Sequence, residues 1–410
     1  MRIVVLGAGV IGTTTAFMLA EASHEVVVIE RAARAGEGTS RANGAILHPS
    51  AVAPWSAPGV PRQVLRWMGD AEAPFLLRAG AVPHMWRWGL EFLRECRADR
   101  HAANAAANLG LAIETLAALA GIRERTGITW HRRPAGVLKL FTDAAALDAA
   151  DAGASRLRAA GLDVRRLDPA GIATLDPSLA RIGNQVAGAL HTLQDEVSDA
   201  REFCVRLAEW SATNLAVEYR YATTVEALEV TGRQVQGVRT SAATIPADAV
   251  VVALGPESGR FLRRYGVRPK IWPVKGVSIT MPRAAWPDAP EVALLDDERH
   301  FAFVPLDGRL RVVGSAEIAG FDATPDPTRI RALTRRVAML FPDFPKPDAP
   351  EAIEGAELWA GLRPVRPSGT PLIGPARTLG GLWLNTGHGH TGWTQSAGSA
   401  ARLAAMIGRA

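Results

Sequence analysis

Cysteine and tyrosine are scarce in this chain. Of its 410 residues only two are cysteines, Cys96 and Cys204, and three are tyrosines. The two thiols stand far apart and form neither a disulfide framework nor a CxxC pair, which excludes a disulfide-rich scaffold and a cysteine zinc site. We therefore expect no bound metal. This cysteine usage fits a reducing compartment or indifference to one, and we expect a cytoplasmic protein.

Long apolar runs and lysines are scarce as well. No stretch of about 18 uninterrupted apolar residues occurs, so the sequence predicts no transmembrane helix. Few lysines leave arginine to carry most of the net charge of +5. That balance suits an anionic partner such as a lipid surface, or simply a basic solvated surface. Because no basic–aromatic module is present, we expect no nucleic-acid partner.

The first 31 residues hold a strand–turn–helix–strand pattern. An apolar strand over 2–6 leads into a glycine turn at 7–12, a helix-compatible run over 13–22 and a second strand over 25–29. A secretory signal peptide is excluded for this stretch. Its charged region is a single Arg2, glycines interrupt the apolar residues, and no small-residue cleavage site follows.

Each glycine of the turn has a distinct task in a dinucleotide fold. Gly7 permits the tight turn, Gly9 lets backbone N–H groups approach a pyrophosphate, and Gly12 lets the helix pack against the strand. The phosphates then lie at the positive end of the helix dipole. Glu30, at the tip of the second strand, can accept hydrogen bonds from an adenosine ribose. The pattern predicts dinucleotide binding.

Two stretches after this unit have unusual compositions. Residues 35–44 lack hydrophobic periodicity and are rich in glycine and hydroxyl side chains, which predicts an ordered loop over a ligand. Residues 49–100 combine proline, tryptophan and arginine, and an amphipathic helix is predicted over 82–100. Its apolar face comprises Met85, Trp88, Phe92 and Cys96. This composition is typical either of a core with an arginine rim or of a membrane or partner surface.

The middle of the chain alternates predicted helices and strands. Helices are predicted over 102–125, 144–160, 199–212 and 328–341. Strands are predicted over 127–141, 215–221, 223–230, 235–240, 249–254, 268–281, 301–304 and 310–316, with a hairpin turn at Asp307-Gly308. The apolar strand that contains Ala253 and ends at Gly255 has the form that closes a nucleotide-binding sheet around the adenosine.

The last 50 residues contain a second glycine-rich turn. A strand over 382–385 runs into Gly387-His388-Gly389-His390-Thr391-Gly392-Trp393-Thr394, and a helix is predicted from there to about 407. A glycine-rich turn that opens a helix favours negative charge. We therefore expect it at the N1/O2 edge of a flavin.

Together these motifs resemble the FAD-dependent D-amino-acid oxidase / glycine oxidase family. The stretches that carry the resemblance are residues 7–12, Glu30-Arg31, 39–44, 53–61, 273–276, 361–364, 384–389 and 392–394. The resemblance covers nearly the whole chain in order. It implies an α/β fold with a discontinuous Rossmann-like FAD-binding domain (1–85, 150–265 and 351–410) and an antiparallel-sheet α+β substrate domain (86–149 and 266–350).

The resemblance also implies roles for individual residues. Arg363 would bind the substrate carboxylate, a geometry that a guanidinium suits; the alternative is an arginine that only caps the C-terminal strand. Lys275 would lie near the flavin or be a surface strand residue. The implied FAD-binding residues are Gly7, Gly9, Val10, Ile11, Gly12, Glu30, Arg31, Ser40, Arg41, Ala42, Asn43, Gly44, Ile46, Val225, Ala253, Gly255, Gly387, Gly389, His390, Thr391, Gly392, Trp393 and Thr394.

The chain departs from the family pattern near the expected substrate site. Family oxidases often place a tyrosine beside the arginine, but Tyr219, Tyr221 and Tyr265 all stand in segments assigned to the adenine side. His48 and His390 are polar substitutes near the flavin, or merely structural. No cysteine stands near the C-terminal motif, so FAD should be non-covalent.

The resemblance implies an enzyme that oxidatively deaminates D-amino acids. A hydride passes from the substrate Cα to flavin N5, the imino acid is hydrolysed to a 2-oxo acid and ammonia, and the electrons pass to a quinone or another acceptor. The alternatives are an O2-using oxidase of D-amino or imino acids, a nicotinamide-dependent dehydrogenase and a non-catalytic flavoprotein. Peripheral contact with the inner face of the membrane is part of the same expectation.

Overall fold

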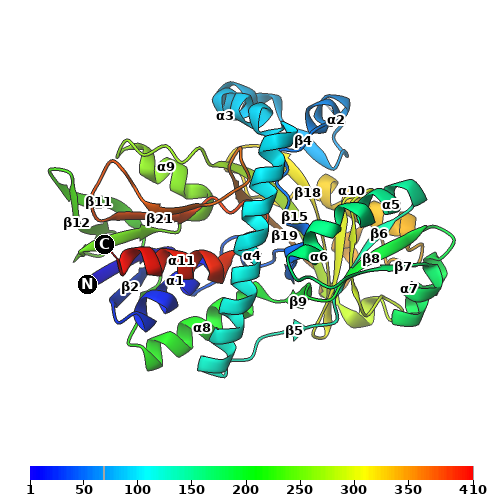
Figure 1. Cartoon of the computed structure of the whole chain (residues 1–410), viewed down its shortest axis with the longest axis horizontal. Helices are drawn as coiled ribbons and strands as arrows, with labels where there is room; N and C mark the ends of the chain where they lie inside the picture. The colour runs from blue at the N-terminus through cyan, green and yellow to red at the C-terminus, as the bar shows by residue number, and fades with distance from the viewer. Residues whose placement is uncertain (68–69, 410) are drawn as a thin grey trace.

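A parallel sheet near the chain termini is the first of two large layers. The computed structural model describes residues 1–67 and 70–409. In spatial order the sheet contains β10 (Glu218–Arg220), β2 (Glu25–Ile29), β1 (Arg2–Leu6), β14 (Ala249–Val252), β21 (Leu382–Thr386) and β20 (Leu372–Pro375). The strands from β10 to β21 are parallel, and β20 is antiparallel to β21. Figure 1 shows both termini beside this sheet.

The alternation of side chains along β1 explains how this sheet is covered. Ile3 and Val5 pack in a core with the helices on one face, whereas Val4 and Leu6 pack with a small sheet on the other. The covering helices are α1 (Val10–Glu21), α4 (Ala98–Thr126), α8 (Ala200–Asn214) and α11 (Ser396–Ile407). The small sheet contains β11 (Val225–Thr231), β12 (Gln234–Thr240) and β13 (Thr244–Pro246). Burial on both faces accounts for the continuous apolar runs of these strands.

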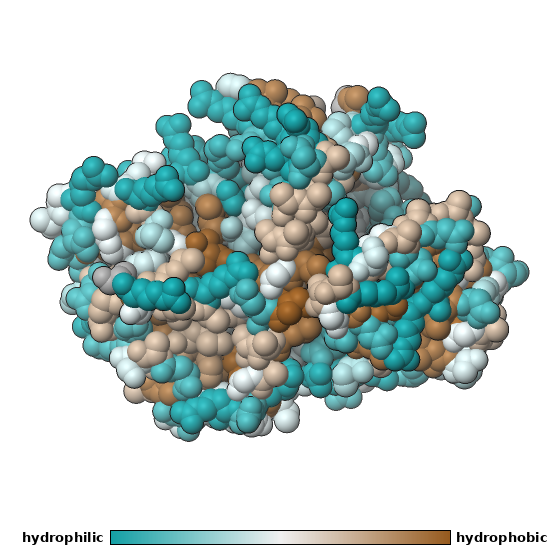
Figure 2. Space-filling view, in the orientation of Figure 1, coloured by the Kyte–Doolittle hydropathy of each residue, from teal (hydrophilic) through white to brown (hydrophobic). Residues whose placement is uncertain are grey.

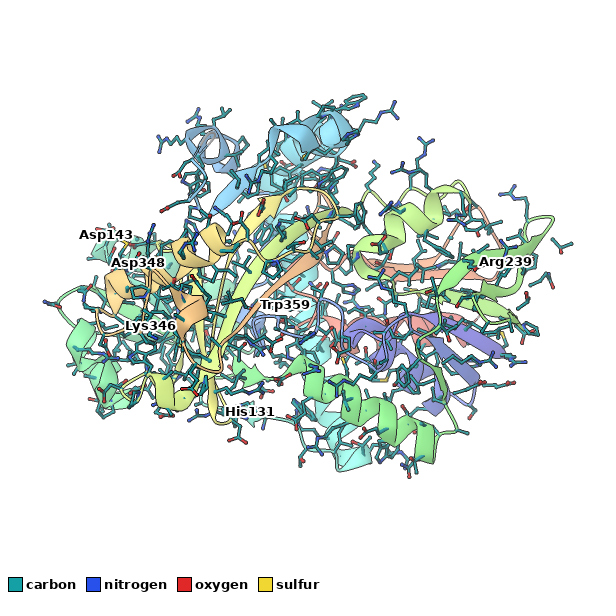
Figure 3. The ribbon with its side chains drawn as sticks, turned by 180° about the vertical axis from the view of Figure 1, so that it is seen from behind. His131, Asp143, Arg239, Lys346, Asp348 and Trp359 are labelled. Atoms are coloured by element: carbon teal, nitrogen blue, oxygen red, sulfur yellow. The ribbon has the colours of Figure 1, made fainter. Side chains whose placement is uncertain are left out.

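A nine-stranded mixed sheet forms the second layer. Its order is β19 (Glu357–Val365), β15 (Trp272–Pro282), β18 (Arg309–Ile318), β17 (Phe301–Leu306), β16 (Ala293–Asp296), β6 (Val137–Phe141), β8 (Gly188–Thr192) and β7 (Val164–Leu167), with β4 (Phe75–Leu77) beside β18. Helix α10 (Pro327–Leu340) buries Ile330, Leu333, Val337 and Leu340 against one face. Trp359, labelled in Figure 3, lies on β19 in the middle of the molecule, where the two layers meet.

The smaller elements connect or cap these layers. A three-stranded sheet joins β3 (Ile46–Leu47), β9 (Glu196–Ser198) and β5 (Arg132–Arg133). The other helices are α2 (Val60–Trp67), α3 (Val82–Glu95), α5 (Ala144–Gly153), α6 (Ser155–Ala159), α7 (Pro169–Leu175) and α9 (Ser258–Arg263). Figure 1 shows α2 and α3 as a separate cap above the junction of the layers.

Strand pairing differs from the predicted domain boundaries in three segments. The departures lie in all three predicted FAD-binding segments: β4 belongs to 1–85, β7 and β8 belong to 150–265, and β19 belongs to 351–410, but all four strands lie in the nine-stranded sheet. The chain crosses between the layers more often than the predicted boundaries allow. Strand β19 pairs with β15 along its whole length, from Trp272 opposite Val365 to Thr280 opposite Glu357. This pairing places the start of the C-terminal segment in the second layer, while the rest of the segment returns to the first.

Local backbone conformation shortens several predicted elements. The strand predicted over 215–221 is only β10, because Ala216 adopts a positive φ of 52° after the end of α8. The strand predicted from 268 begins at Trp272, beyond Lys270 with φ 54°. The C-terminal helix begins at Ser396, so the glycine-rich turn precedes it rather than opening it.

Helix α4 has the length and apolar composition of a membrane span. No transmembrane helix was predicted from the sequence, because polar residues interrupt the apolar run of this helix. Its buried side chains, including Leu111, Ala112, Leu119 and Ile122, face the protein. Of these, Leu119 and Ile122 share a core with α1 and α11. We therefore interpret α4 as a scaffold helix of this fold.

Candidate active site

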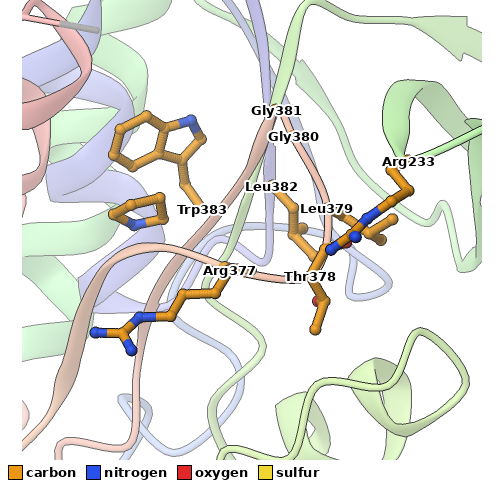
Figure 4. A pocket seen from close by; sticks show the side chains of 10 residues that line it. Arg233, Arg377, Thr378, Leu379, Gly380, Gly381, Leu382 and Trp383 are labelled. Atoms are coloured by element: carbon orange, nitrogen blue, oxygen red, sulfur yellow. The ribbon is translucent and has the colours of Figure 1, made fainter.

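A cavity of about 1630 Å³ extends between the two layers. The glycine turn after β1 lines it, together with strands β15, β18 and β19 of the larger sheet. Drug-sized ligands usually occupy pockets of about 300–1,000 Å³, so this cavity can hold a dinucleotide and a further small molecule. A separate hollow of about 290 Å³ (Figure 4), lined by Arg233 and residues 375–383, is too small for a dinucleotide.

The turn from Gly7 to Gly12 has no room for side chains at its two ends. A Cβ on Gly7, whose φ is +97°, would lie 2.9 Å from the carbonyl oxygen of Ala253. A Cβ on Gly12 would lie 1.8 Å from the carbonyl oxygen of Gly7. At Gly9 the nearest atom is Ser40 Oγ at 3.6 Å, so that position faces open space. These positions match the three glycine tasks that the sequence predicted.

Glu30 is held at the tip of β2, in the cavity wall. Its Oε2 accepts a hydrogen bond from the backbone N–H of Ala8 at 2.7 Å, and its Oε1 accepts one from Ala32 at 2.9 Å. Each carboxylate oxygen has a further lone pair for a ligand hydroxyl. The fit to the ribose of a dinucleotide is therefore good.

The loop over 38–45 is fastened to the larger sheet. Ser40 Oγ accepts a hydrogen bond from the N–H of Val10 at 3.1 Å. Ser278 donates to the carbonyl of Ala42 at 3.0 Å, and Arg311 Nη1 donates to the carbonyl of Asn43 at 3.1 Å. Burial lowers the pKa of Arg311 to about 10, but the group remains charged at neutral pH. These contacts tie the loop both to the glycine turn and to the larger sheet, so that it bridges the two sides of the cavity.

Most of the predicted cofactor residues line this cavity. They are Gly7, Gly9, Val10, Ile11, Glu30, Arg31, Ser40, Ala42, Asn43, Gly44, Ile46, Val225, Ala253, Gly255, Gly387, Gly389, His390, Gly392 and Trp393.

Four predicted cofactor residues lie behind the wall. Gly12 packs against the turn, and Arg41 pairs with Glu357 at 2.8 Å. Thr391 donates to the carbonyl of His388 at 3.0 Å, and Thr394 accepts from the backbone of His48 at 3.2 Å. Within the described residues these side chains support the wall and do not line it.

Arg363 projects from β19 into the cavity wall. Within residues 1–67 and 70–409 no carboxylate pairs with it, and its protein hydrogen bond is from Nη1 to the carbonyl of Ser315 at 3.0 Å. Burial lowers the pKa of Arg363 to about 10, so it stays protonated near pH 7. Arg363 is half-buried, and a partly desolvated cation without a counter-ion is costly unless a ligand supplies the negative charge. The site is therefore built for an anion.

Two predicted histidines lie in the same part of the wall. Burial lowers the pKa of His48 to about 4 and that of His390 to about 3, so both imidazoles are neutral near pH 7. The ring of His390 stacks on Trp55 with centroids 4.8 Å apart and an interplanar angle of 9°. These histidines contribute polar surface to the cavity rather than positive charge.

Lys275 is not where either prediction placed it. Its side chain is buried at 3% exposure, outside the cavity wall, and its Nζ lies 3.0 Å from Asp322 and 3.6 Å from Glu317. Strand alternation explains this position, because the neighbouring Val274 and Gly276 face the cavity. Lys275 neutralises a buried acid and has no contact with the cavity.

Sequence reasoning missed other residues of the wall. Trp55 belongs to the 53–61 stretch that carries the family resemblance, but no role was predicted for it. No role was predicted for Trp359 or Ser315 either, and all three residues line the cavity. Alternation along β19 places Trp359 on the same face as Arg363, four residues before it, but no strand was predicted there.

Comparison with known proteins identifies the family. The family model described as FAD dependent oxidoreductase, DAO, matches residues 2–406. The chain belongs to the DAO family of FAD-dependent oxidoreductases. The resemblance, the FAD cofactor and the enzymatic character predicted from the sequence are thereby confirmed.

Relatives of known name cover the whole chain. D-amino acid dehydrogenase of Sinorhizobium medicae is 41% identical over 407 residues, which are 99% of this chain and 96% of the relative. The enzyme of the same name from Paramagnetospirillum magneticum is 39% identical over 408 residues, 99% of this chain and 95% of its own.

Solved structures of the DAO family share the fold. Glycine oxidase from Geobacillus kaustophilus superposes with a TM-score of 0.72 at 24% identity, covering 100% of this chain and 95% of its own. L-proline dehydrogenase from P. horikoshii gives a TM-score of 0.73 at 18% identity, with 99% and 92% covered. The predicted fold class, a Rossmann-like FAD-binding domain joined to an α+β domain with an antiparallel sheet, is confirmed, although two strand pairs of the second sheet, β16–β6 and β18–β4, are parallel.

Proposed function

We propose that this DAO-family enzyme oxidatively deaminates D-amino acids as a dehydrogenase. The observation that carries the proposal is the half-buried guanidinium of Arg363, which has no carboxylate partner among the described residues and shares one cavity with the glycine turn and Glu30. Two relatives near 40% identity over nearly the full chain bear the name D-amino acid dehydrogenase, which supports the substrate class.

FAD fits the cavity and, when bound, supplies the oxidant that takes a hydride from the substrate Cα. Gly9 and Val10 would hold its phosphates and Glu30 its ribose, without a covalent bond. Across the cavity, Arg363 would bind the substrate carboxylate through a charge-assisted hydrogen-bond pair and so orient the Cα–H bond. The imino acid that results takes up water and leaves as a 2-oxo acid and ammonia.

The neutral histidines suit the form of the substrate that reacts. An amino acid loses its hydride as the neutral amine, and a cation beside that amine would disfavour the positive charge that develops on the imine nitrogen. Because His48 and His390 have pKa values of about 4 and about 3, neither adds such a cation near pH 7. The charge of Arg363 is directed at the carboxylate instead.

The first test separates a dehydrogenase from an oxidase. We expect purified yellow enzyme to reduce an artificial electron acceptor with D-alanine or D-proline and to form little peroxide in air. L-alanine is the control substrate. Stoichiometric peroxide without an added acceptor would instead support the oxidase alternative, and failure of all D-amino acids to bleach the flavin anaerobically would contradict the proposal.

A quinone acceptor would require contact with a membrane, and the cap of α2 and α3 offers a surface for it. The predicted apolar face of α3 is core, because Met85, Trp88 and Cys96 are buried. A second stripe of the same helix is exposed, and it consists of Val82, Trp86, Leu90 and Leu93. Exposed Leu65 lies on α2. In Figure 2 apolar side chains show at the outer edge of the cap among hydrophilic ones.

Arginines next to this stripe favour an anionic lipid surface. Arg62 and Arg66 on α2, and Arg87 and Arg94 on α3, are exposed beside the apolar residues. Exposed tryptophan, leucine and arginine together are the composition of helices that lie in a bilayer interface. We propose peripheral attachment of a cytoplasmic enzyme to the inner face of the membrane through this cap.

Co-sedimentation tests the attachment. We expect binding to vesicles that contain about 30% phosphatidylglycerol, weaker binding at high salt, and a several-fold lower bound fraction for the double variant Trp86→Glu/Leu90→Glu. Met339→Glu is the matched control, because Met339 is 66% exposed on α10, outside the cap. Equal binding of the cap variant and the control would contradict the proposal.

A further inference from the structure

The loop from Val52 to Ser56 lines the cavity beside Arg363, and helix α4 forms hydrogen bonds to both ends of the loop. Asn108 on α4, which is buried, donates its Nδ2 to the carbonyls of Val52 at 2.9 Å and Gly369 at 3.1 Å. His101, also on α4, contacts the carbonyl of Ser56 through Nδ1 at 3.0 Å. These bonds hold the loop in one position, so Trp55 at its centre has little freedom to move.

The indole of Trp55 contacts the two groups that define the anion site. The guanidinium carbon of Arg363 lies 5.5 Å from the ring centroid, within the range of a cation–π interaction. The ring also stacks on neutral His390, at a centroid distance of 4.8 Å. Trp55 lines the cavity, as do both of its partners.

Arg363 needs such a neighbour because little else orients it. Ser315 accepts one hydrogen bond from Nη1, and no acid of the described residues pairs with the guanidinium. Beneath it lies Gly276, where a Cβ would be 2.2 Å from Nη1. The guanidinium is therefore confined between a glycine backbone and an indole ring, which leaves its remaining N–H groups available to a ligand.

None of the three tyrosines can take this place. Tyr219 and Tyr221 stack on each other in the core under α8. The hydroxyl oxygen of Tyr265 accepts a hydrogen bond from the backbone N–H of Leu228 in the small sheet at 2.6 Å. Among the described residues that line the cavity, aromatic contact with Arg363 comes from Trp55.

We infer that Trp55 is a positioning residue of the substrate carboxylate site, where its indole holds the Arg363 guanidinium and excludes water from the carboxylate that Arg363 binds. That the bound carboxylate belongs to a D-amino acid rests on the proposed function. That Arg363 and Trp55 bind a carboxylate does not. A desolvated guanidinium over an indole forms a stronger contact than one in water, so its removal has a measurable effect on anion affinity.

The test measures carboxylate binding and turnover in the FAD-loaded enzyme. We expect Trp55→Ala to raise the Kd of sodium benzoate, followed by the change in flavin absorbance, and the KM for D-alanine by about 30-fold each. Its kcat should stay within about threefold, because the hydride transfer step is unchanged once substrate is bound. Trp55→Phe keeps an aromatic ring against Arg363 and should restore the Kd to within about fivefold of wild type.

Two controls separate positioning from general damage. Trp86→Ala removes an indole that is 54% exposed on α3 and should leave the benzoate Kd unchanged. FAD content and Tm of each variant show whether the fold is intact, and Trp55→Leu, which keeps apolar volume without an aromatic ring, replaces Trp55→Ala if that variant does not fold. A benzoate Kd in Trp55→Ala equal to wild type, or an equal loss in Trp55→Phe and Trp55→Ala, overturns the inference. Absence of D-amino-acid turnover with the 30-fold difference in Kd retained overturns only the proposed function.

Discussion

Replacement of Arg363 by alanine should raise KM for D-amino acids by about two orders of magnitude. Arg363 lines the cavity and has no carboxylate partner among the described residues, so its removal would leave the substrate carboxylate without its counter-charge. Removal of one partner from a buried charged hydrogen-bond pair costs about 2–5 kcal/mol, and about 3 kcal/mol corresponds to the expected factor. Steady-state kinetics with D-alanine and an artificial acceptor measure it.

The lysine variant is the matched control for this substitution. Arg363→Lys keeps the positive charge but loses the planar fork that binds a carboxylate through two N–H groups. We expect its KM to fall between those of wild type and Arg363→Ala. FAD content should be normal in both variants, since Arg363 makes its hydrogen bond to Ser315 and not to the glycine turn. Unchanged KM in Arg363→Ala would refute the role of Arg363 in carboxylate binding.

Gly12→Ala should yield a colourless protein. The added Cβ would lie 1.8 Å from the carbonyl oxygen of Gly7, so either the turn or the start of α1 has to shift by more than an ångström. Such a shift moves the backbone N–H groups that face the pyrophosphate. We expect the Kd for FAD to rise by at least about 100-fold, measured by titration of the apoprotein with FAD and fluorescence.

A second helical glycine provides the comparison for Gly12. A Cβ on Gly121, inside α4, would meet no atom within 4 Å. Gly121→Ala should therefore retain FAD and gain slightly in stability, because alanine favours a helix over glycine by about 1 kcal/mol. Equal FAD affinity in Gly12→Ala and Gly121→Ala would show that the close approach at Gly12 does not control the cofactor site.

The dinucleotide half of the site could be predicted from the sequence because its contacts are local. Gly7, Gly12 and Glu30 stand within one strand–turn–helix–strand unit, and Glu30 accepts its hydrogen bond from Ala8. The spacing of the glycines encodes a backbone conformation, and the apolar strands encode burial on both faces of a parallel sheet. No distant partner has to be known for any of these features.

The substrate half depends on strand pairing between distant segments. The β15 register shifts between Lys275 and Val277, so that Val274, Gly276 and Val277 all line the cavity while Lys275 faces a buried acid. A sequence pattern does not show where a bulge interrupts the alternation of a strand. The bulge brings Val277 to the cavity, whereas Lys275 follows the ordinary alternation of the strand. Its position was mispredicted because the sequence does not show which face of β15 borders the cavity, while Arg363 on β19 lines the cavity.

The sequence alone determined the family, the FAD cofactor and the glycine turn, since these follow from short motifs in a fixed order. Only the tertiary structure decided which side chains surround Arg363. Trp55 comes from the proline-rich loop after β3, His390 from the turn before α11, and Gly276 from the middle of β15. They meet because the two sheets lie side by side with the cavity between them (Figure 1), and that arrangement depends on the combined burial of many distant residues rather than on any one segment.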